Sequence, residues 1–425
     1  MRSSFWLLPV SILFLVGMWQ YADRILVPYQ ISDAALHGRP RGNLSDLYPR
    51  WLGARELLLH GRNPYSPEVT RDIQAGYYGR VLDPSHAEDP RDQQAFAYPL
   101  YVVFYLAPTI RVPFDIVRKG FFWLLLVLTV VGIPIWLRIL RWRLAGSMQA
   151  VVVALTLGSM VVLQGLKLQQ ITLLVAALLA ITIALLISDH AIGAGIVLAI
   201  ATIKPQLVCG LVLWLVVWTA GDFRQRYRWM VSFLTTLTIL CIAAELFLPH
   251  WIASFWVAVH EYQAYTDAVP LLDRLIPNPW SRLVELGAAI GTLLSAWKYR
   301  KAAHTSGEFA LMICLVLALT LLIIPTYALY NQVLLIPSLL LIARDVRMLW
   351  VRNAVYRVLV SAVAALLVWP YLSSSVLAGL SFVMRAEVVQ KLWAVPAWTS
   401  LTLPVAVSAL MLVVAYRGSL GRIPA

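Results

Sequence analysis

Long apolar runs, separated by short polar segments, dominate the chain from end to end. The runs extend for roughly 15–22 residues, which at about 1.5 Å per helical residue is enough to cross a hydrocarbon layer of about 30 Å. The pattern predicts an all-α polytopic integral membrane protein, a single membrane domain over 1–425 with about 11–13 transmembrane helices. The expected spans are 5–23, 97–110, 120–137, 148–164, 170–187, 190–203, 206–220, 229–248, 281–297, 308–324, 329–343, 353–371 and 398–416.

The composition agrees with a membrane protein and argues against nucleic-acid binding. Of the 425 residues, 60% are apolar and 13% charged, whereas soluble domains have roughly 45–50% apolar and about 25% charged residues. The net charge is +13, but the cations form short clusters beside apolar runs, as topology signals and headgroup contacts do. Cys209, Cys241 and Cys314 lie inside apolar runs at no metal-ligand spacing, so we interpret them as packing residues.

The basic clusters also predict an orientation. They begin at Arg138, Arg224, Lys298, Arg344 and Arg417, and the positive-inside rule places them in the cytoplasm. Three longer polar segments, 24–96, 249–280 and 372–397, are then expected outside a cell membrane, with the active site facing the periplasm or exterior. This orientation conflicts with three full spans before Arg138, so whether 97–110 crosses fully stays open at this point.

Within the first outer segment, residues 45–61 have the pattern of an amphipathic helix at the membrane interface. Pro49 suits its first turn and Gly61 its end. Four apolar residues recur at helical spacing on one face: Leu47, Trp51, Ala54 and Leu58.

Asp46, at the start of this predicted helix, is the candidate for acid–base chemistry. One interpretation is a helix cap shared with Ser45. The other is a general base, a carboxylate that removes a proton from an acceptor hydroxyl as its oxygen attacks the anomeric carbon of a sugar.

Lys204 is the candidate for binding an anion. It ends an apolar run directly before Pro205, where a helix must break or kink, and the count of spans places it on the outer side. A lysine within the membrane costs about 2.5–3.5 kcal/mol on insertion scales and is a functional candidate by default. Gln170 and Lys167 are expected nearby and would extend the site. The alternatives are a Lys204 side chain that snorkels to the interface and an ordinary interfacial charge at Lys167.

Two other polar stretches carry weaker signals. His260 and Glu261, in the second outer segment, stand among aromatic residues and suit an acceptor-binding role, although a plain solvated loop explains them equally well. The acidic stretch 83–92 has no clean Asp-x-Asp spacing, and we interpret it as a loop. The chain has no phosphate-binding loop, zinc-protease motif or dinucleotide fingerprint. We therefore expect no metal and no cofactor.

A set of short motifs spans residues 46 to 337 in a fixed order. It begins with Arg50-Trp51-Leu52-Gly53-Ala54-Arg55 and Gly61-Arg62-Asn63-Pro64-Tyr65, and continues through 96–100, 169–174, 193–206 and 327–337. The ordered set resembles glycosyltransferase family 87, the C-type enzymes that use polyprenyl-phosphate sugars and include actinobacterial mannosyltransferases. The chain departs from the family pattern at Leu100, Gln169, Thr172 and Asn331.

The resemblance implies an inverting transfer of a hexose, such as mannose, from a polyprenyl-phosphate donor to a lipid or glycan acceptor. It places Asp46 in the role of the base. The chemistry of the residues suggests Lys204, Gln170 and Lys167 for the donor phosphate, and six residues are candidates for the sugar or acceptor pocket: Arg50, Tyr98, Tyr330, Asn331, His260 and Glu261. The alternative from another class is a secondary transporter or flippase of lipid-linked sugars. Two observations argue against it: the apolar runs contain few charged residues, and the two halves of the sequence show no internal repeat.

Overall fold

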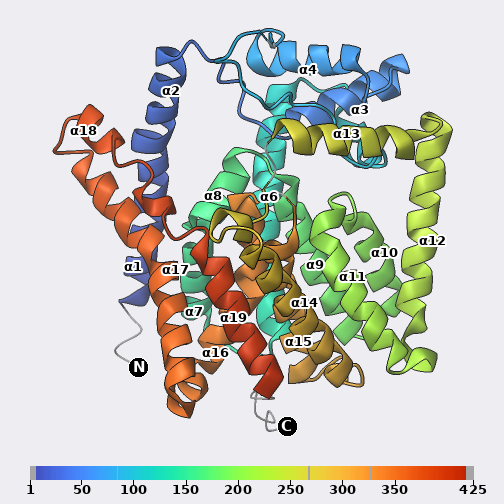
Figure 1. Cartoon of the computed structure of the whole chain (residues 1–425), viewed down its shortest axis with the longest axis vertical. Coiled ribbons are helices and arrows are strands. Elements are labelled where there is room, and N and C mark those ends of the chain that lie inside the picture. Colours follow the sequence, from blue (N-terminus) through green and yellow to red (C-terminus); the bar gives the residue numbers. More distant parts are fainter. Residues whose placement is uncertain (1–5, 84, 267–268, 326, 418–425) are drawn as a thin grey trace.

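The described part of the chain is entirely helical. The computed structural model describes residues 6–83, 85–266, 269–325 and 327–417, and every regular element within these ranges is a helix. Most helices stand side by side, with the start of the first described helix and the end of the last at one end of the bundle and the first polar segment at the other (Figure 1). The predicted all-α, polytopic membrane class is therefore confirmed.

Five helical segments of the described residues are long and apolar enough to cross a membrane. The first joins α1 (Leu7–Tyr21) through the π-helical turn Ala22–Leu26 to α2 (Val27–Leu36), and the others are α6 (Phe114–Ile139), α12 (Phe223–Phe247), α17 (Ala354–Leu380) and the segment Ala386–Arg417. That last segment contains α18 (Ala386–Gln390), the 3₁₀ turn Val395–Ala397 and α19 (Thr402–Arg417). A sixth span results if α7 (Gly146–Leu157) and α8 (Met160–Lys167), bent by 62° at their junction, count as one.

Several apolar runs fold into helices that are shorter than a membrane crossing. These are α9 (Ile171–Ile187), α10 (Ala191–Ala201), α11 (Pro205–Ala220) and α15 (Gly307–Ile323). At 1.5 Å per residue they measure about 17–26 Å, less than the hydrocarbon thickness of about 30 Å. The bundle is completed by α14 (Trp280–Tyr299) and α16 (Ile336–Arg352). The described residues thus give five or six candidate spans instead of the predicted 11–13. The prediction counted apolar runs, and an apolar run does not reveal whether a helix crosses the membrane or is buried among its neighbours.

The run 97–110 does not form a crossing helix. It folds into α5 (Val102–Leu106) and the 3₁₀ turn Ala107–Thr109. The Thr109 carbonyl accepts a 3.1 Å hydrogen bond from Nε1 of Trp51, which belongs to the first polar segment. The Tyr101 hydroxyl donates to the carbonyl of Thr202 at 2.9 Å, which holds this segment against the end of α10. Because the run stays at one end of the bundle, the conflict over orientation disappears.

The helix ends next to the basic clusters lie at the end of the bundle opposite the first outer segment (Figure 1). Hydrogen bonds from their side chains join the turns between helices that are distant in sequence. The bonded pairs are Arg138 with Ser188 at 3.4 Å, Arg226 with the Arg300 carbonyl at 2.7 Å, Lys298 with the Tyr416 carbonyl at 3.0 Å, and Arg344 with the Leu140 carbonyl. The shared face is the arrangement that the predicted orientation requires.

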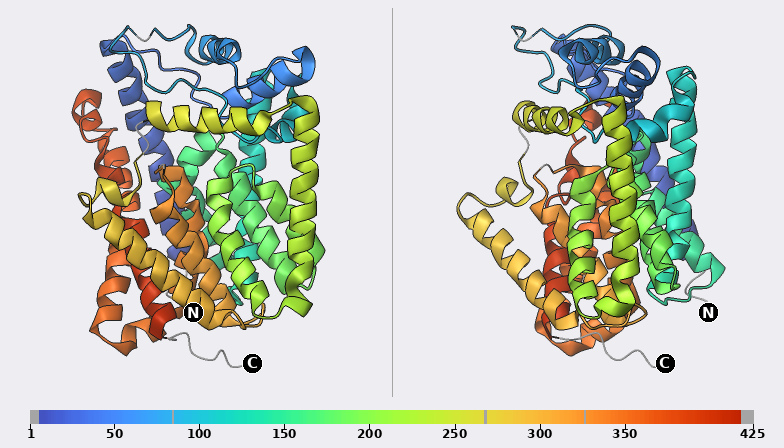
Figure 2. Two further views of the ribbon diagram at one scale, coloured as in Figure 1. Left: turned by 45° about the vertical axis from the view of Figure 1, so that its right-hand side comes forward. Right: turned by 90° about the vertical axis from the view of Figure 1, so that its right-hand side faces the viewer.

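A layer of crosswise helices covers the opposite end. It consists of α3 (Tyr48–His60), α4 (Pro67–Tyr78) and α13 (Trp251–Tyr265), which run across the ends of the upright helices (Figure 2). The helix predicted over residues 45–61 is present as α3, and Gly61 ends it with φ +65°. On its apolar face Leu47, Trp51 and Ala54 are buried and Leu58 is half-buried, so this face anchors the layer on the bundle.

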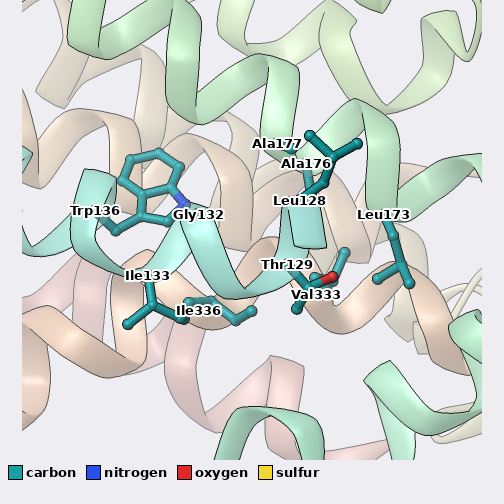
Figure 3. Close-up of a pocket in the computed structure, with 10 residues that line it drawn as sticks. All are labelled: Leu128, Thr129, Gly132, Ile133, Trp136, Leu173, Ala176, Ala177, Val333 and Ile336. Carbon is teal, nitrogen blue, oxygen red and sulfur yellow. The ribbon is translucent and has the colours of Figure 1, made fainter. Parts of the chain in front are cut away.

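A small apolar cavity interrupts the packing between α6, α9 and the start of α16 (Figure 3). Its volume is about 20 Å³, which is room for about one water, but such apolar cavities stay dry. It is lined by Leu128, Thr129, Gly132, Ile133, Trp136, Leu173, Ala176, Ala177, Val333 and Ile336. A methyl group added at Gly132 would meet no other atom within 4 Å.

Gly195 presents the opposite situation, because α10 and α12 meet there at close range. A Cβ at this position would overlap Ser232 and the Trp229 carbonyl, and it would lie 2.8 Å from the Phe233 nitrogen. Small residues at helix–helix contacts of this kind let two backbones approach closely.

We predict opposite effects for two glycine-to-alanine substitutions within helices. Gly195→Ala should destabilise the protein by about 1–3 kcal/mol, because the methyl group forces backbones apart. Gly132→Ala should leave stability unchanged or raise it by about 0.5–1 kcal/mol, because alanine is the better helix former. Thermal unfolding in detergent micelles measures both. Equal melting temperatures for the two variants would contradict the close packing of α10 on α12.

Candidate functional site

Asp46 lies immediately before α3 and does not cap it. The helix begins after Leu47, and no side chain caps its first turn. The Asp46 N–H donates to the Leu168 carbonyl at 2.9 Å, and its carboxylate oxygen Oδ2 accepts a hydrogen bond from Gln170 Nε2. The cap interpretation is therefore wrong: the half-buried carboxylate points from the outer layer to the start of α9.

Lys204 lies at the break between α10 and α11, and its side chain is only 6% exposed. Its Nζ donates to Thr172 Oγ1 at 2.6 Å and stands 4.9 Å from the ring centroid of Tyr330. The snorkelling alternative is wrong, because the amine is turned inward to polar side chains. Pro205 occupies the first turn of α11, so the helix starts here without needing that N–H.

Two helix N-termini meet at this place. Gln170 is the residue before α9 and Lys204 is the residue before α11, and both are buried. The N-terminus of a helix carries about half a positive charge and has N–H groups without helical partners. Together with the lysine, these termini form a positively charged environment below the crosswise layer.

Arg50 and Tyr98 connect the acid to the lysine. The guanidinium of Arg50 donates to the Asp46 carbonyl and lies 4.4 Å from the ring centroid of Tyr98. The charges of Lys204 and Arg50 both act on the Tyr98 side chain. The Nε of Arg50 is buried and has no hydrogen-bond partner, which leaves a donor available inside the site.

The electrostatics of the site favour a protonatable carboxyl group. Burial raises the pKa of Asp46, Arg50 and Lys204 act to lower it, and Asp92 adds to the increase, so that the pKa stays above its ordinary value. Burial also acts to raise the pKa of Tyr98, but the charges of Lys204 and Arg50 outweigh it and hold that pKa below its usual range. An acid with a raised pKa beside fixed cations is typical of catalytic and binding sites.

On the far side of Lys204, the 3₁₀ segment Leu329–Leu335 brings in Tyr330 and Asn331. Asn331 is buried and its Oδ1 accepts a hydrogen bond from Thr172 Oγ1 at 3.1 Å. The sequence-based candidates Tyr330 and Asn331 therefore join the cluster. Thr172, which in the sequence is only a departure from the family pattern, is the residue that joins Asn331 to Lys204.

The second outer segment contributes a different residue from the two predicted. His260 and Glu261 are exposed on α13, and the His260 ring is bonded to the Trp256 carbonyl of its own helix at 2.8 Å. Tyr262, the next residue, is partly buried. Burial raises its pKa to about 12, and the charges of Asp92, Arg50 and Asp46 also act on its hydroxyl group. One step along a helix turns a side chain by 100°, and the sequence alone did not indicate which residue of α13 faces the bundle.

Asp92 is a second acid that sequence reasoning missed, because its acidic stretch looked like an ordinary loop. Its carboxylate accepts hydrogen bonds from the Gln94 backbone at 3.0 Å and the Gln94 side chain at 2.9 Å. Burial raises its pKa, and Arg50 acts against that increase.

Lys167 is held apart from Lys204 by its own contacts. Its amine forms an ion pair with Asp23 and lies 5.4 Å from the ring centroid of Trp19. Of the predicted anion-binding residues, Gln170 and Lys204 are thus brought together with Asp46, whereas Lys167 faces the α1–α2 segment. Within the described ranges, no three His, Cys, Asp or Glu side chains group in a way that could hold a metal ion.

Comparison of the chain with protein-family models, with curated proteins and with solved structures gave no match.

Proposed function

We propose that the protein is an inverting glycosyltransferase of C-type architecture that uses a polyprenyl-phosphate hexose, such as mannose, at the outer face of the cell membrane. The observation that carries the proposal is the approach of a half-buried carboxylate, Asp46, to a buried cation, Lys204, between the membrane bundle and the crosswise layer. The order of the sequence motifs over residues 46 to 337 supports the same class.

In the proposed reaction, the acceptor hydroxyl oxygen attacks the anomeric carbon and gives its proton to Asp46. The bond between the anomeric carbon and the phosphate oxygen breaks, and its electron pair leaves with the lipid phosphate. The configuration at the anomeric carbon inverts because one displacement occurs. Asp46 suits the role of base, since a raised pKa brings it nearer to neutral operating pH.

The leaving phosphate gains negative charge in the transition state and needs fixed positive groups. Lys204 and the N-termini of α9 and α11 would supply them, with Gln170 between phosphate and base. Lys167 stays outside this donor site because its amine already contacts Asp23 and Trp19.

The aromatic and amide side chains around the lysine would hold the sugar. Tyr98, Tyr330 and Tyr262 offer hydroxyl groups and ring faces, and Asn331 adds an amide. Arg50, with an unpartnered Nε, can donate to a sugar or acceptor oxygen. His260 and Glu261 are exposed beyond this cluster, which restricts them to a more distant part of an acceptor.

The base role predicts that Asp46→Asn lowers the transfer rate by about 10²–10⁴-fold, the usual contribution of a general base. The measurement is transfer or hydrolysis of polyprenyl-phosphate-mannose by the purified protein in liposomes. Asp72→Asn is the matched control, because this exposed acid of α4 pairs with Arg62 at 2.7 Å, and it should leave the rate unchanged. Equal rates for wild type and Asp46→Asn would contradict the proposal, and movement of the intact sugar-lipid without bond cleavage would favour the transporter class.

The pH dependence of the rate should respond to the two charges on either side of Asp46. A base works ionised, so activity is present above its pKa and is lost as the pH falls through it. Arg50 lowers the pKa of Asp46 and Asp92 raises it. Arg50→Gln should therefore move the acidic limb of kcat/KM to higher pH, and Asp92→Asn should move it to lower pH. Limbs that shift in the same direction would show that Asp46 is not the titrating group.

A further inference from the structure

A second cavity lies beside the candidate site, between the α1–α2 segment, α8 and the loop 41–44. Its volume is about 760 Å³, within the range of about 300–1,000 Å³ that is usual for ligand pockets. The loop that lines it leads directly into Asp46, yet neither Asp46 nor Lys204 is part of its wall. This cavity is therefore a separate space from the proposed donor site.

The wall of the cavity carries an excess of positive charge. Arg41, Arg118 and Lys167 line it, and Asp23 is the one acid among its lining residues. Asp23 is paired with Lys167, so the charges of Arg41 and Arg118 remain to be balanced. An anion is the complementary ligand.

Two polar side chains in this wall have buried atoms without partners. The Nε and Nη2 of Arg41 are buried and form no hydrogen bond, and the same is true of Oε1 of Gln164. Leaving such buried atoms unpaired is unfavourable, and more so for a charged group. An oxyanion would satisfy the guanidinium through two parallel hydrogen bonds, and the Gln164 amide can turn to present its NH₂ group to the same ligand.

Much of the remaining wall is apolar and comes from the first membrane-crossing segment and from α8, although Gln30 and Asn43 add polar groups. Met18 and Leu26 come from the first span, and Met160 and Leu163 come from α8. A free inorganic anion would make no favourable contact with this apolar surface, whereas the hydrocarbon chains of a lipid would pack against it. The cavity combines a cationic, hydrogen-bonding part with an apolar part along the membrane.

We propose that this cavity binds an anionic membrane lipid, with the phosphate of its headgroup on Arg41 and its chains along α1 and α8. The site is independent of the transfer reaction, because none of its residues acts in that mechanism. The lipid would occupy the space directly behind the loop 41–44 and thereby support the segment that positions Asp46.

Binding of short-chain phosphatidylglycerol and phosphatidylcholine to the full-length protein in a neutral detergent tests the proposal. Phosphatidylglycerol should bind more tightly, and Arg41→Gln should weaken its binding by about tenfold or more, the loss expected when a charged hydrogen bond is removed. Arg71→Gln is the matched control, because this exposed cation of α4 lies in the same outer layer but outside the cavity. It should leave the affinity unchanged.

Two further measurements test whether the ligand is a lipid or a free anion. Val27→Trp would fill the apolar part of the cavity, and it should weaken binding of the lipid although every cation remains. Inorganic phosphate should not compete at concentrations comparable to those of the lipid. Equal binding of the two lipids, unchanged affinity in Arg41→Gln, or full competition by inorganic phosphate would each overturn the proposal. The elution volume and the helical content of each variant, compared with wild type, identify loss of binding that comes from misfolding.

Discussion

The candidate site depends on one constraint, which is that the ammonium group of Lys204 is withdrawn from water. A buried charge persists only with polar partners and compensating fields, and the fold supplies these from four separate segments: Tyr98 after the first loop, Thr172 on α9, Tyr330 in the last 3₁₀ segment, and Asp46 before α3. Each segment must stop or turn at the same depth in the bundle. The shortness of α9, α10 and α11 follows from this, since a full-length crossing helix would carry its polar end past the lysine.

The parts of the site that the sequence predicted were those with strong local signals. A lysine followed by proline at the end of an apolar run indicates both a helix break and an isolated charge, and the structure has both at Lys204. The helix after Asp46 was predictable for a similar reason, because Pro49, Gly61 and the spacing of the apolar face are properties of the segment itself. Asp46 and Gln170 could be proposed together because the orientation places both at one membrane face.

The parts that the sequence did not predict depend on neighbours rather than on local pattern. The apolar runs of α9, α10, α11 and α15 look like crossing helices, but their composition reflects burial by protein, and only their lengths reveal it. Tyr262 differs from Glu261 by one helical step, and the packing of α13 decides which of them turns inward. Asp92 belongs to an irregular loop. No hydrophobic periodicity in the sequence indicates that this loop brings Asp92 close enough to Arg50 for their charges to interact.

The hydrogen bonds among the basic clusters have a consequence for motion. Arg226 donates to the carbonyls of Trp218, Arg300 and Ala302 at once, while Lys298 and Arg344 hold two more turns. An end of the bundle fastened in this way resists rocking of one half against the other, the movement by which carriers expose a site to each side in turn. In the proposed reaction, substrates would then enter and leave at the end that the crosswise helices α3, α4 and α13 cover.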